Sequence, residues 1–194
     1  MKLIVTLLIL MTGFQLVAQD KDLPYFEIPS YPDRYSAGLV AARMVDGLGF
    51  RFYWATEGLR PEDLAFKPNT EARTTEETIE HIYGMSSVIL NATTKQINGP
   101  AQNKKLSFSE MRKKTLENLR AASDILRASS AKDLERYNAM FEQGDKIVEL
   151  PFWNLLNGPI ADCLWHVGQI VSFRRSSGNP FSAKADVFRG IVKD

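Results

Sequence analysis

Two histidines and one aspartate are the residues of this sequence best suited to chemistry. His81 lies in the segment TIEHIYGM, and His166 follows Asp162 by four residues. Because 3.6 residues make one helical turn, a carboxylate and an imidazole four residues apart lie on the same side of a helix. Such a pair can chelate a metal ion, so Asp162 and His166 are candidate ligands.

The apolar surroundings of Asp162 predict that its helix is largely buried. A buried carboxylate is costly unless it is paired, hydrogen-bonded or bound to a metal. The pattern leaves three partners open for Asp162: a metal ion, the pair Arg174 and Arg175, or His166 in an ion pair. The spacing of Asp162 and His166 alone does not show which of these three partners Asp162 has.

Other reactive residue types are explained more simply by structure. Cys163 is predicted to be a small buried hydrophobe rather than a nucleophile, and Trp54, Trp153 and Trp165 are predicted to lie in the core. Glu77 lies one turn before the first histidine and is a candidate to orient it. The sequence contains no G-x-S-x-G elbow and no Gly-rich phosphate loop.

The positions of Pro and Gly and the spacing of apolar residues divide the chain into four long helices. The predicted helices cover residues 34–59, 74–95, 107–128 and 151–176. Gly47 and Gly49 should weaken the first helix. Pro159 should kink or break the last one, because it removes a backbone donor and crowds the carbonyl four residues earlier.

Two of these helices carry a capping box at their N-termini. Thr74 precedes Glu77 by three residues, and Ser107 precedes Glu110 in the same way. In this arrangement the hydroxyl and the carboxylate satisfy backbone donors at the helix start. We therefore expect helices to begin directly after Thr74 and Ser107.

The segment before the last helix has weaker signals. A short helical turn is expected at residues 134–140, a tight turn at 143–145 and a short extended piece at 147–150. With almost no other strand signal, the fold class is predicted to be all-α, a four-helix bundle, with a looser helical array as the alternative.

The N-terminus predicts export. Residues 1–19 combine Lys2, a short apolar run and a small-residue exit, as in a secretory signal peptide. The run is only about half of what a bilayer-spanning helix needs, so no stable membrane anchor is expected. Residues 20–33, rich in Pro, should form an extended lead-in, and residues 34–194 one helical domain. A periplasmic or extracellular location follows.

The charge balance argues against nucleic acid as a partner. The chain has 24 basic side chains, including Lys2, and 23 acidic ones, so the mature chain is formally neutral. A polyanion-binding surface normally shows a clustered basic excess. The densest cluster, residues 112–114, is interpreted as a solvated helix face.

The stretch PFWNLLNGPIADCLWHVGQIVSFRRSSGNP resembles the last bundle helix of the DinB-like (YfiT-like) superfamily. The family signature there is a metal-binding histidine followed by Gly-Gln and a downstream Arg, which reads here as His166, Gly168, Gln169 and Arg174 or Arg175. The family's histidine on the second helix matches His81. The resemblance covers essentially the whole mature chain.

The resemblance implies an up-down-down-up four-helix bundle with a three-histidine metal site. This chain has Asp162 where the family has the first histidine of its last pair, so the implied ligands are His81, Asp162 and His166. Two histidines and a carboxylate form a known open-site set for zinc or nickel, and also for iron or manganese. The implied functions are a metal-dependent hydrolase with a small-molecule substrate, a metal-dependent thiol S-transferase, or a non-enzymatic exported binding protein. Family members often form dimers, so a homodimer is also implied.

Overall fold

Four long helices dominate the protein. The computed structural model describes residues 23–100 and 105–194 of the chain. The helical elements are α1 (Ala37–Thr56), α2 (Pro61–Ala65), α3 (Thr75–Thr94), α4 (Phe108–Arg127), α5 (Ala131–Leu134), α6 (Phe152–Leu155), the π-helical turn η1 (Leu156–Ile160) and α7 (Ala161–Ser176).

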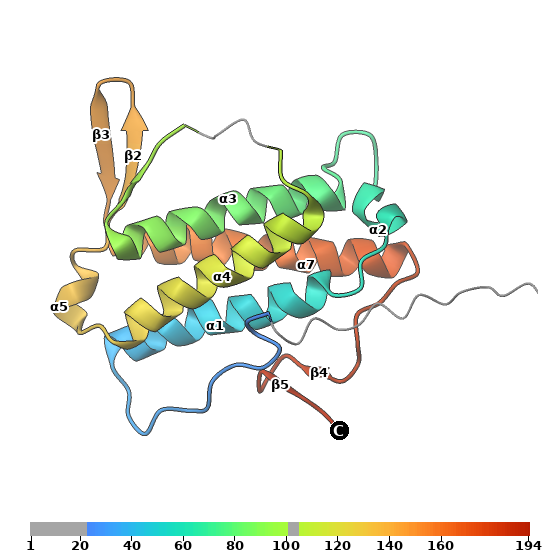
Figure 1. Cartoon of the computed structure of the whole chain (residues 1–194), viewed down its shortest axis with the longest axis horizontal. Helices are drawn as coiled ribbons and strands as arrows, with labels where there is room; N and C mark the ends of the chain where they lie inside the picture. Colours follow the sequence, from blue (N-terminus) through green and yellow to red (C-terminus); the bar gives the residue numbers. More distant parts are fainter. Residues whose placement is uncertain (1–22, 101–104) are drawn as a thin grey trace, which may run out of the picture.

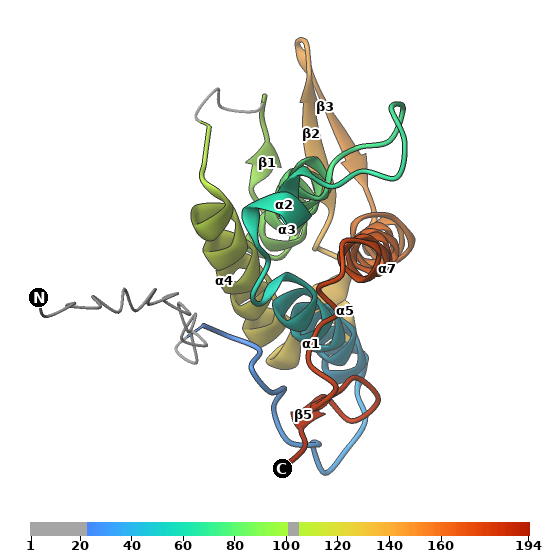
Figure 2. The same cartoon turned by 90° about the vertical axis from the view of Figure 1, so that its right-hand side faces the viewer.

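The long helices form a bundle in which each packs against two neighbours. Seen nearly end-on in Figure 2, α1 lies beside α4 and α7, and α3 lies beside the same two helices. The colours of Figure 1 show that α1 and α7 run in one direction and α3 and α4 in the other. The fully buried apolar side chains of the bundle interior include Val45, Leu48, Ile82, Leu119 and Ile170. Packing of these side chains holds α3 against α7, the pair that carries the candidate ligands.

Small sheets accompany the helices, so the expectation of almost no strand is wrong. The strands are β1 (Ile97–Asn98), β2 (Ala139–Gln143), β3 (Lys146–Leu150), β4 (Ala185–Asp186) and β5 (Ile191–Val192). β2 and β3 form an antiparallel hairpin, β1 pairs with β2 in parallel, and β4 pairs with β5 antiparallel. Residues 139 and 140, expected in a helical turn, are part of β2 because they pair with β3 across the turn at Gly144, where φ is +59°. The predicted turn at 143–145 is confirmed.

The helix boundaries agree closely with the capping and proline signals. Thr74 and Ser107 accept hydrogen bonds from the backbone N–H groups of Glu77 and Glu110, and both capping boxes are complete. The predicted break at Pro159 is also confirmed. There the last helix widens into the π-helical turn η1, in which Gly158 has the non-helical angles φ −92° and ψ −108°.

The lead-in is fastened to α1 by a tyrosine. The ring of Tyr25 lies directly over Gly49, where an added Cβ would come within 2.4 Å of the ring. The Tyr25 hydroxyl donates to Asp46, which also accepts from Ser123 and Arg127. Gly49 therefore does more than weaken the helix, because the close approach of this ring requires a residue without a side chain.

One buried hydroxyl lacks a partner, and its removal should stabilise the protein. Among the described residues, Thr115 Oγ1 is the only buried side-chain oxygen or nitrogen without a hydrogen bond. Thr115→Val replaces it with a methyl group of similar size, and we expect the free energy of unfolding to rise by about 1 kcal/mol. Urea denaturation measures this change.

The control for that substitution is Thr78→Val. The Thr78 hydroxyl is equally buried but donates to the carbonyl of Thr74 at 2.8 Å, so its loss should lower stability. If both variants lose stability equally, the hydroxyl of Thr115 has a partner in solution.

A buried carboxylate should make the stability of the fold depend on pH. Asp63 is fully buried and accepts hydrogen bonds from Arg60, Ser177 and Asn179. Burial by itself would raise the pKa of Asp63, but these bonds together lower it below its usual range. A carboxylate with a lowered folded-state pKa stabilises the fold above its unfolded pKa, and this contribution is lost as the pH falls.

We therefore expect the stability advantage of the native chain over Asp63→Asn to be constant near neutral pH. The advantage should shrink below about pH 4, the ordinary pKa of an aspartate. Urea denaturation of both proteins at pH 7, 5, 4 and 3 measures it. An advantage that does not change with pH would show that the charge of Asp63 contributes nothing.

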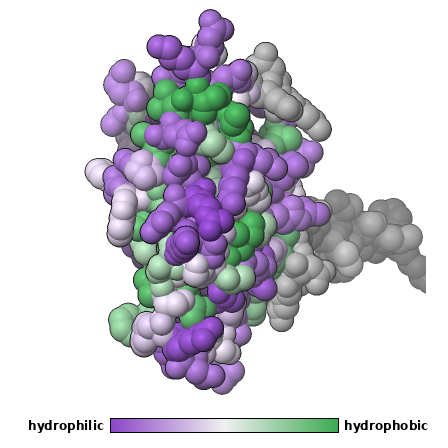
Figure 3. All heavy atoms as spheres, turned by 90° about the vertical axis from the view of Figure 1, so that its left-hand side faces the viewer, coloured by the Kyte–Doolittle hydropathy of each residue, from purple (hydrophilic) through white to green (hydrophobic). Residues whose placement is uncertain are grey.

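The surface mixes apolar and polar side chains. Figure 3 shows the end of the molecule that carries the β2–β3 hairpin, and hydrophobic groups there lie between hydrophilic ones.

Within residues 23–100 and 105–194, no helix has the length and apolar character needed to cross a membrane. The predicted signal peptide, residues 1–19, lies outside the described residues.

Candidate metal site

The three predicted ligands lie together at the contact between α3 and α7. His81 lies in the second turn of α3, and Asp162 and His166 lie in the first turns of α7. The kink at Gly158 and Pro159 comes directly before Asp162. A π-helical turn changes the direction in which the following residues point, and such turns are frequent at functional sites. Here it sets the orientation of the helix that presents the carboxylate.

Asp162 is the centre of the cluster. Its Oδ2 lies 2.8 Å from Nε2 of His81, and its Oδ1 lies 3.5 Å from Nε2 of His166. The two imidazole rings approach edge to face, with centroids 4.7 Å apart. One ligand atom from each of the three residues lies within 4.8 Å of the others. Of the alternatives left open by the sequence, the arginines are therefore not the partners of Asp162.

The cluster is open to solvent on one side. The side chains of His81, Asp162 and His166 are 29%, 39% and 16% exposed. Trp165 is 74% exposed, so it does not cover the histidine and aspartate contact. This exposure leaves space for water or a ligand beside the three side chains, as an open coordination site requires.

The donor set fits a divalent transition-metal ion. Ligand atoms around zinc bound at about 2.1 Å lie roughly 3.4 Å apart in a tetrahedral site. The separations of 2.8 and 3.5 Å, which join the two histidines to different oxygens of Asp162, bracket that value, and one ligand atom from each of the three residues lies within 4.8 Å of the others. Two imidazoles and one carboxylate suit zinc, nickel, iron or manganese.

Gln169 contacts the ring nitrogen of His166 that does not face Asp162. The Gln169 Oε1 lies 2.7 Å from Nδ1 of His166. When Nδ1–H donates to this amide oxygen, the lone pair of Nε2 points toward Asp162. Gln169 can therefore fix the ring orientation and the tautomer that a metal ligand needs.

Replacing Gln169 by alanine is expected to weaken Zn²⁺ binding by about tenfold to a hundredfold, because residues that orient a ligand commonly contribute that much to affinity. Isothermal titration calorimetry measures the dissociation constant. Gln169→Glu keeps an oxygen acceptor and should bind zinc as the native chain does. Ser172→Ala on the same helix is the control, and an unchanged affinity in Gln169→Ala would contradict the assigned role.

The other reactive candidates have structural roles. Glu77 accepts from the backbone N–H and the hydroxyl of Thr74, so it caps α3. The thiol of Cys163 is fully buried, and burial together with the charge of Asp162 raises its pKa to about 12. It is therefore a thiol at neutral pH, as the prediction of a small buried hydrophobe requires.

Three expectations about buried and exposed side chains are wrong. Asp162, expected on a largely buried helix, has a side chain that is 39% exposed, and only Cys163, Val167, Ile170 and Arg174 of α7 are buried. Trp54 is buried, but Trp153 and Trp165 are 76% and 74% exposed, because they lie on the outer face of the α6–α7 helix rather than on the face toward α1 and α3. Arg112 belonged to the predicted solvated face, yet it is buried, donates to Thr56 and pairs with Glu57.

Of the two candidate arginines, Arg174 is the one that stabilises the bundle. It is 2% exposed and donates to the carbonyls of Trp54, Ala55 and Glu57 at the C-terminal end of α1. Arg175 is exposed, and its guanidinium lies 5.9 Å from the ring centroid of Phe181.

Comparison with solved structures finds chains of similar fold. The fold resembles that of a DinB-like protein. The solved structure is that of YjoA from Bacillus subtilis, which shares 16% sequence identity with this chain. The match covers 74% of this chain and 90% of YjoA, with a TM-score of 0.46. No protein-family model matches the chain, and no curated protein matches its sequence.

Proposed function

We propose that this chain is a divalent-metal-binding protein of the DinB-like bundle type and that it acts as a metal-dependent hydrolase. One observation carries the proposal. His81, Asp162 and His166 bring three ligand atoms within 4.8 Å of one another at a solvent-open edge of the bundle. Three protein ligands beside open space are typical of catalytic rather than structural metal sites.

The residues of the chain hold and orient the ion. His81 and His166 offer their Nε2 atoms and Asp162 a carboxylate oxygen, while Gln169 orients His166. A bound divalent cation supplies Lewis acidity, which activates water or polarises a substrate oxygen. The carboxylate lowers the net charge of the site, and the exposed side leaves room for a small-molecule substrate. Zinc or nickel is the proposed ion.

The experiment combines elemental analysis with a hydrolysis assay. The purified chain is expected to contain about one divalent ion per molecule, and the metal-loaded protein to hydrolyse at least one of an ester, an amide and a phosphodiester test substrate. His166→Ala should lose both the ion and the activity. Metal content equal to that of the native chain in His166→Ala would refute the site. A loaded native protein inactive on all three substrates would refute hydrolysis and favour a binding protein.

We also propose that the chain is exported after removal of residues 1–19. The apolar run and its small-residue exit support this proposal. Expression of the full chain in a secreting bacterium should yield a protein whose mass corresponds to a start at Asp20. Recovery of the intact chain from the cytosol would contradict it.

A further inference from the structure

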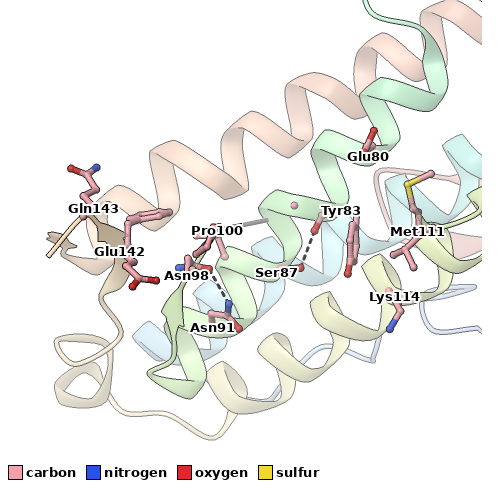
Figure 4. A pocket seen from close by; sticks show the side chains of 16 residues that line it. Glu80, Tyr83, Ser87, Asn91, Asn98, Pro100, Met111, Lys114, Glu142 and Gln143 are labelled. Carbon is pink, nitrogen blue, oxygen red and sulfur yellow. Dashed lines mark hydrogen bonds between the residues drawn. The ribbon is translucent and has the colours of Figure 1, made fainter. Parts of the chain in front are cut away.

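A large cavity lies along the outer face of α3, separate from the three candidate ligands. Its volume is about 1170 Å³, and its walls come from α3, the start of α4, residues 98–100 and the β2–β3 hairpin. Figure 4 shows Glu80 at one end of it and Glu142 and Gln143 at the other. Sites for small ligands typically measure about 300–1,000 Å³, so this cavity has room for an elongated molecule.

A glycine keeps the floor of this cavity open. Gly84 lines the cavity in the middle of α3, and an added Cβ would meet no atom within 4 Å. A glycine inside a helix costs roughly 0.5–1 kcal/mol relative to alanine. No close packing at Gly84 requires that cost, whereas a side chain there would project into the cavity.

The walls carry polar groups with unused hydrogen-bonding capacity. Asn91 uses its Nδ2 to donate to Asn98 at 2.9 Å, which leaves its Oδ1 available. Among the residues that the structure describes, the hydroxyl of Tyr83 and the amide of Gln143 make no hydrogen bond. Amides and hydroxyls of this kind both donate and accept, so they suit a ligand with donors and acceptors along its length.

The charges along the walls favour a neutral ligand. Glu80 and Glu142 are acidic and Lys114 is basic, so a strongly charged molecule of either sign would meet a like charge. The rings of Tyr83 and Phe141 also line the cavity and offer apolar surface. Sugars combine hydroxyl edges with apolar C–H faces and match such a lining.

A peptide fits this cavity less well. Peptides that add to a sheet are held by backbone hydrogen bonds to a free strand edge. Of the two strands at the cavity, β2 pairs with both β1 and β3, and β1 has only two residues. Recognition must therefore come from side chains, as in sugar binding.

We propose that this cavity binds a neutral oligosaccharide. The C–H faces of the sugar rings lie against Tyr83 and Phe141, and the hydroxyl groups bond to Asn91, Gln143 and Glu80. The proposal does not depend on a metal at the neighbouring site, because none of these residues is a candidate ligand.

The test uses four neutral probes, cellotetraose, maltotetraose, xylotetraose and tetra-N-acetylchitotetraose, titrated into the native chain by isothermal titration calorimetry. At least one should show saturable binding at micromolar to millimolar concentration. Gly84→Leu, which fills the floor, should weaken that binding at least about tenfold. Gly168→Leu is the matched control, because Gly168 is also exposed within a helix and its added Cβ also meets no atom within 4 Å. It should bind like the native chain.

Circular dichroism establishes that both leucine variants fold. Absence of saturable binding for all four sugars would overturn the proposal, and so would equal affinity in Gly84→Leu and the native chain. Binding of an extended neutral peptide with no sugar binding would assign the cavity to a different ligand class and would overturn it as well.

Discussion

Asp162→Ala is expected to lower the affinity for Zn²⁺ by roughly a hundredfold. Structural zinc sites gain about 10–16 kcal/mol from four ligands, so the loss of one ligand should cost about 3 kcal/mol, or roughly two powers of ten in the dissociation constant. Asp162 contacts both histidines, and its carboxylate is the only anion among the three ligands. Competition with a chromogenic chelator measures the affinity.

Two further variants make this result specific. Asp162→His restores the three-histidine set that the family resemblance implies, and it should bind zinc within about tenfold of the native chain. Glu80→Ala removes an exposed carboxylate next to His81 and should leave the affinity unchanged. If Asp162→Ala binds zinc as tightly as the native chain, the aspartate is only the ion-pair partner of the histidines.

Arg174→Met is expected to lower the free energy of unfolding by about 3–5 kcal/mol, the range for removing one partner of a buried charged interaction. The Arg174 guanidinium donates to three carbonyls at the end of α1 and to the carbonyl of Asn179. Removal of the side chain leaves these buried acceptors without donors, and it takes a positive charge from the negative end of the helix. Urea denaturation followed by circular dichroism measures the loss.

The neighbouring arginine provides the control. Arg175→Met changes the same chemical group one residue later, but Arg175 is exposed, and such surface substitutions usually alter stability by about 0.5 kcal/mol or less. Arg174→Lys keeps the charge but loses the several donors of the guanidinium, so it should lie between the native chain and Arg174→Met. Equal effects at the two positions would show that burial and the helix-end bonds of Arg174 do not matter.

The parts of the fold that depend on local chemistry were predictable. The hydroxyl and carboxylate at Thr74 and Glu77 satisfy donors within one helical turn, so the start of α3 follows from residues three apart. The break in the last helix follows equally from the missing donor of Pro159. The β2–β3 hairpin was only partly foreseen. Its strands are short, and β2 is stabilised by pairing with β3 and by packing on α3 and α6 rather than by a strong pattern of its own.

The candidate site was predictable to a similar extent. The spacing of Asp162 and His166 places them on one face of a helix, but it leaves several partners open for the carboxylate. The position of His81 opposite them came from the family resemblance, and the structure brings the three side chains together. The sequence analysis did not predict the cavity beside α3, because the β2–β3 hairpin, which forms one of its walls, lies far along the chain from the other wall residues, which fall within residues 80–114.

The sequence by itself determined the number of long helices, their starts and their kink, because caps, prolines and apolar spacing act over a few residues. Only the tertiary structure decided which arginine lies inside, which tryptophans face solvent and which partner Asp162 contacts. Burial and long-range contacts depend on how whole helix faces meet. The sequence does not show which of two adjacent residues, such as Arg174 and Arg175 or Trp165 and His166, is covered by a neighbouring helix and which is left in water.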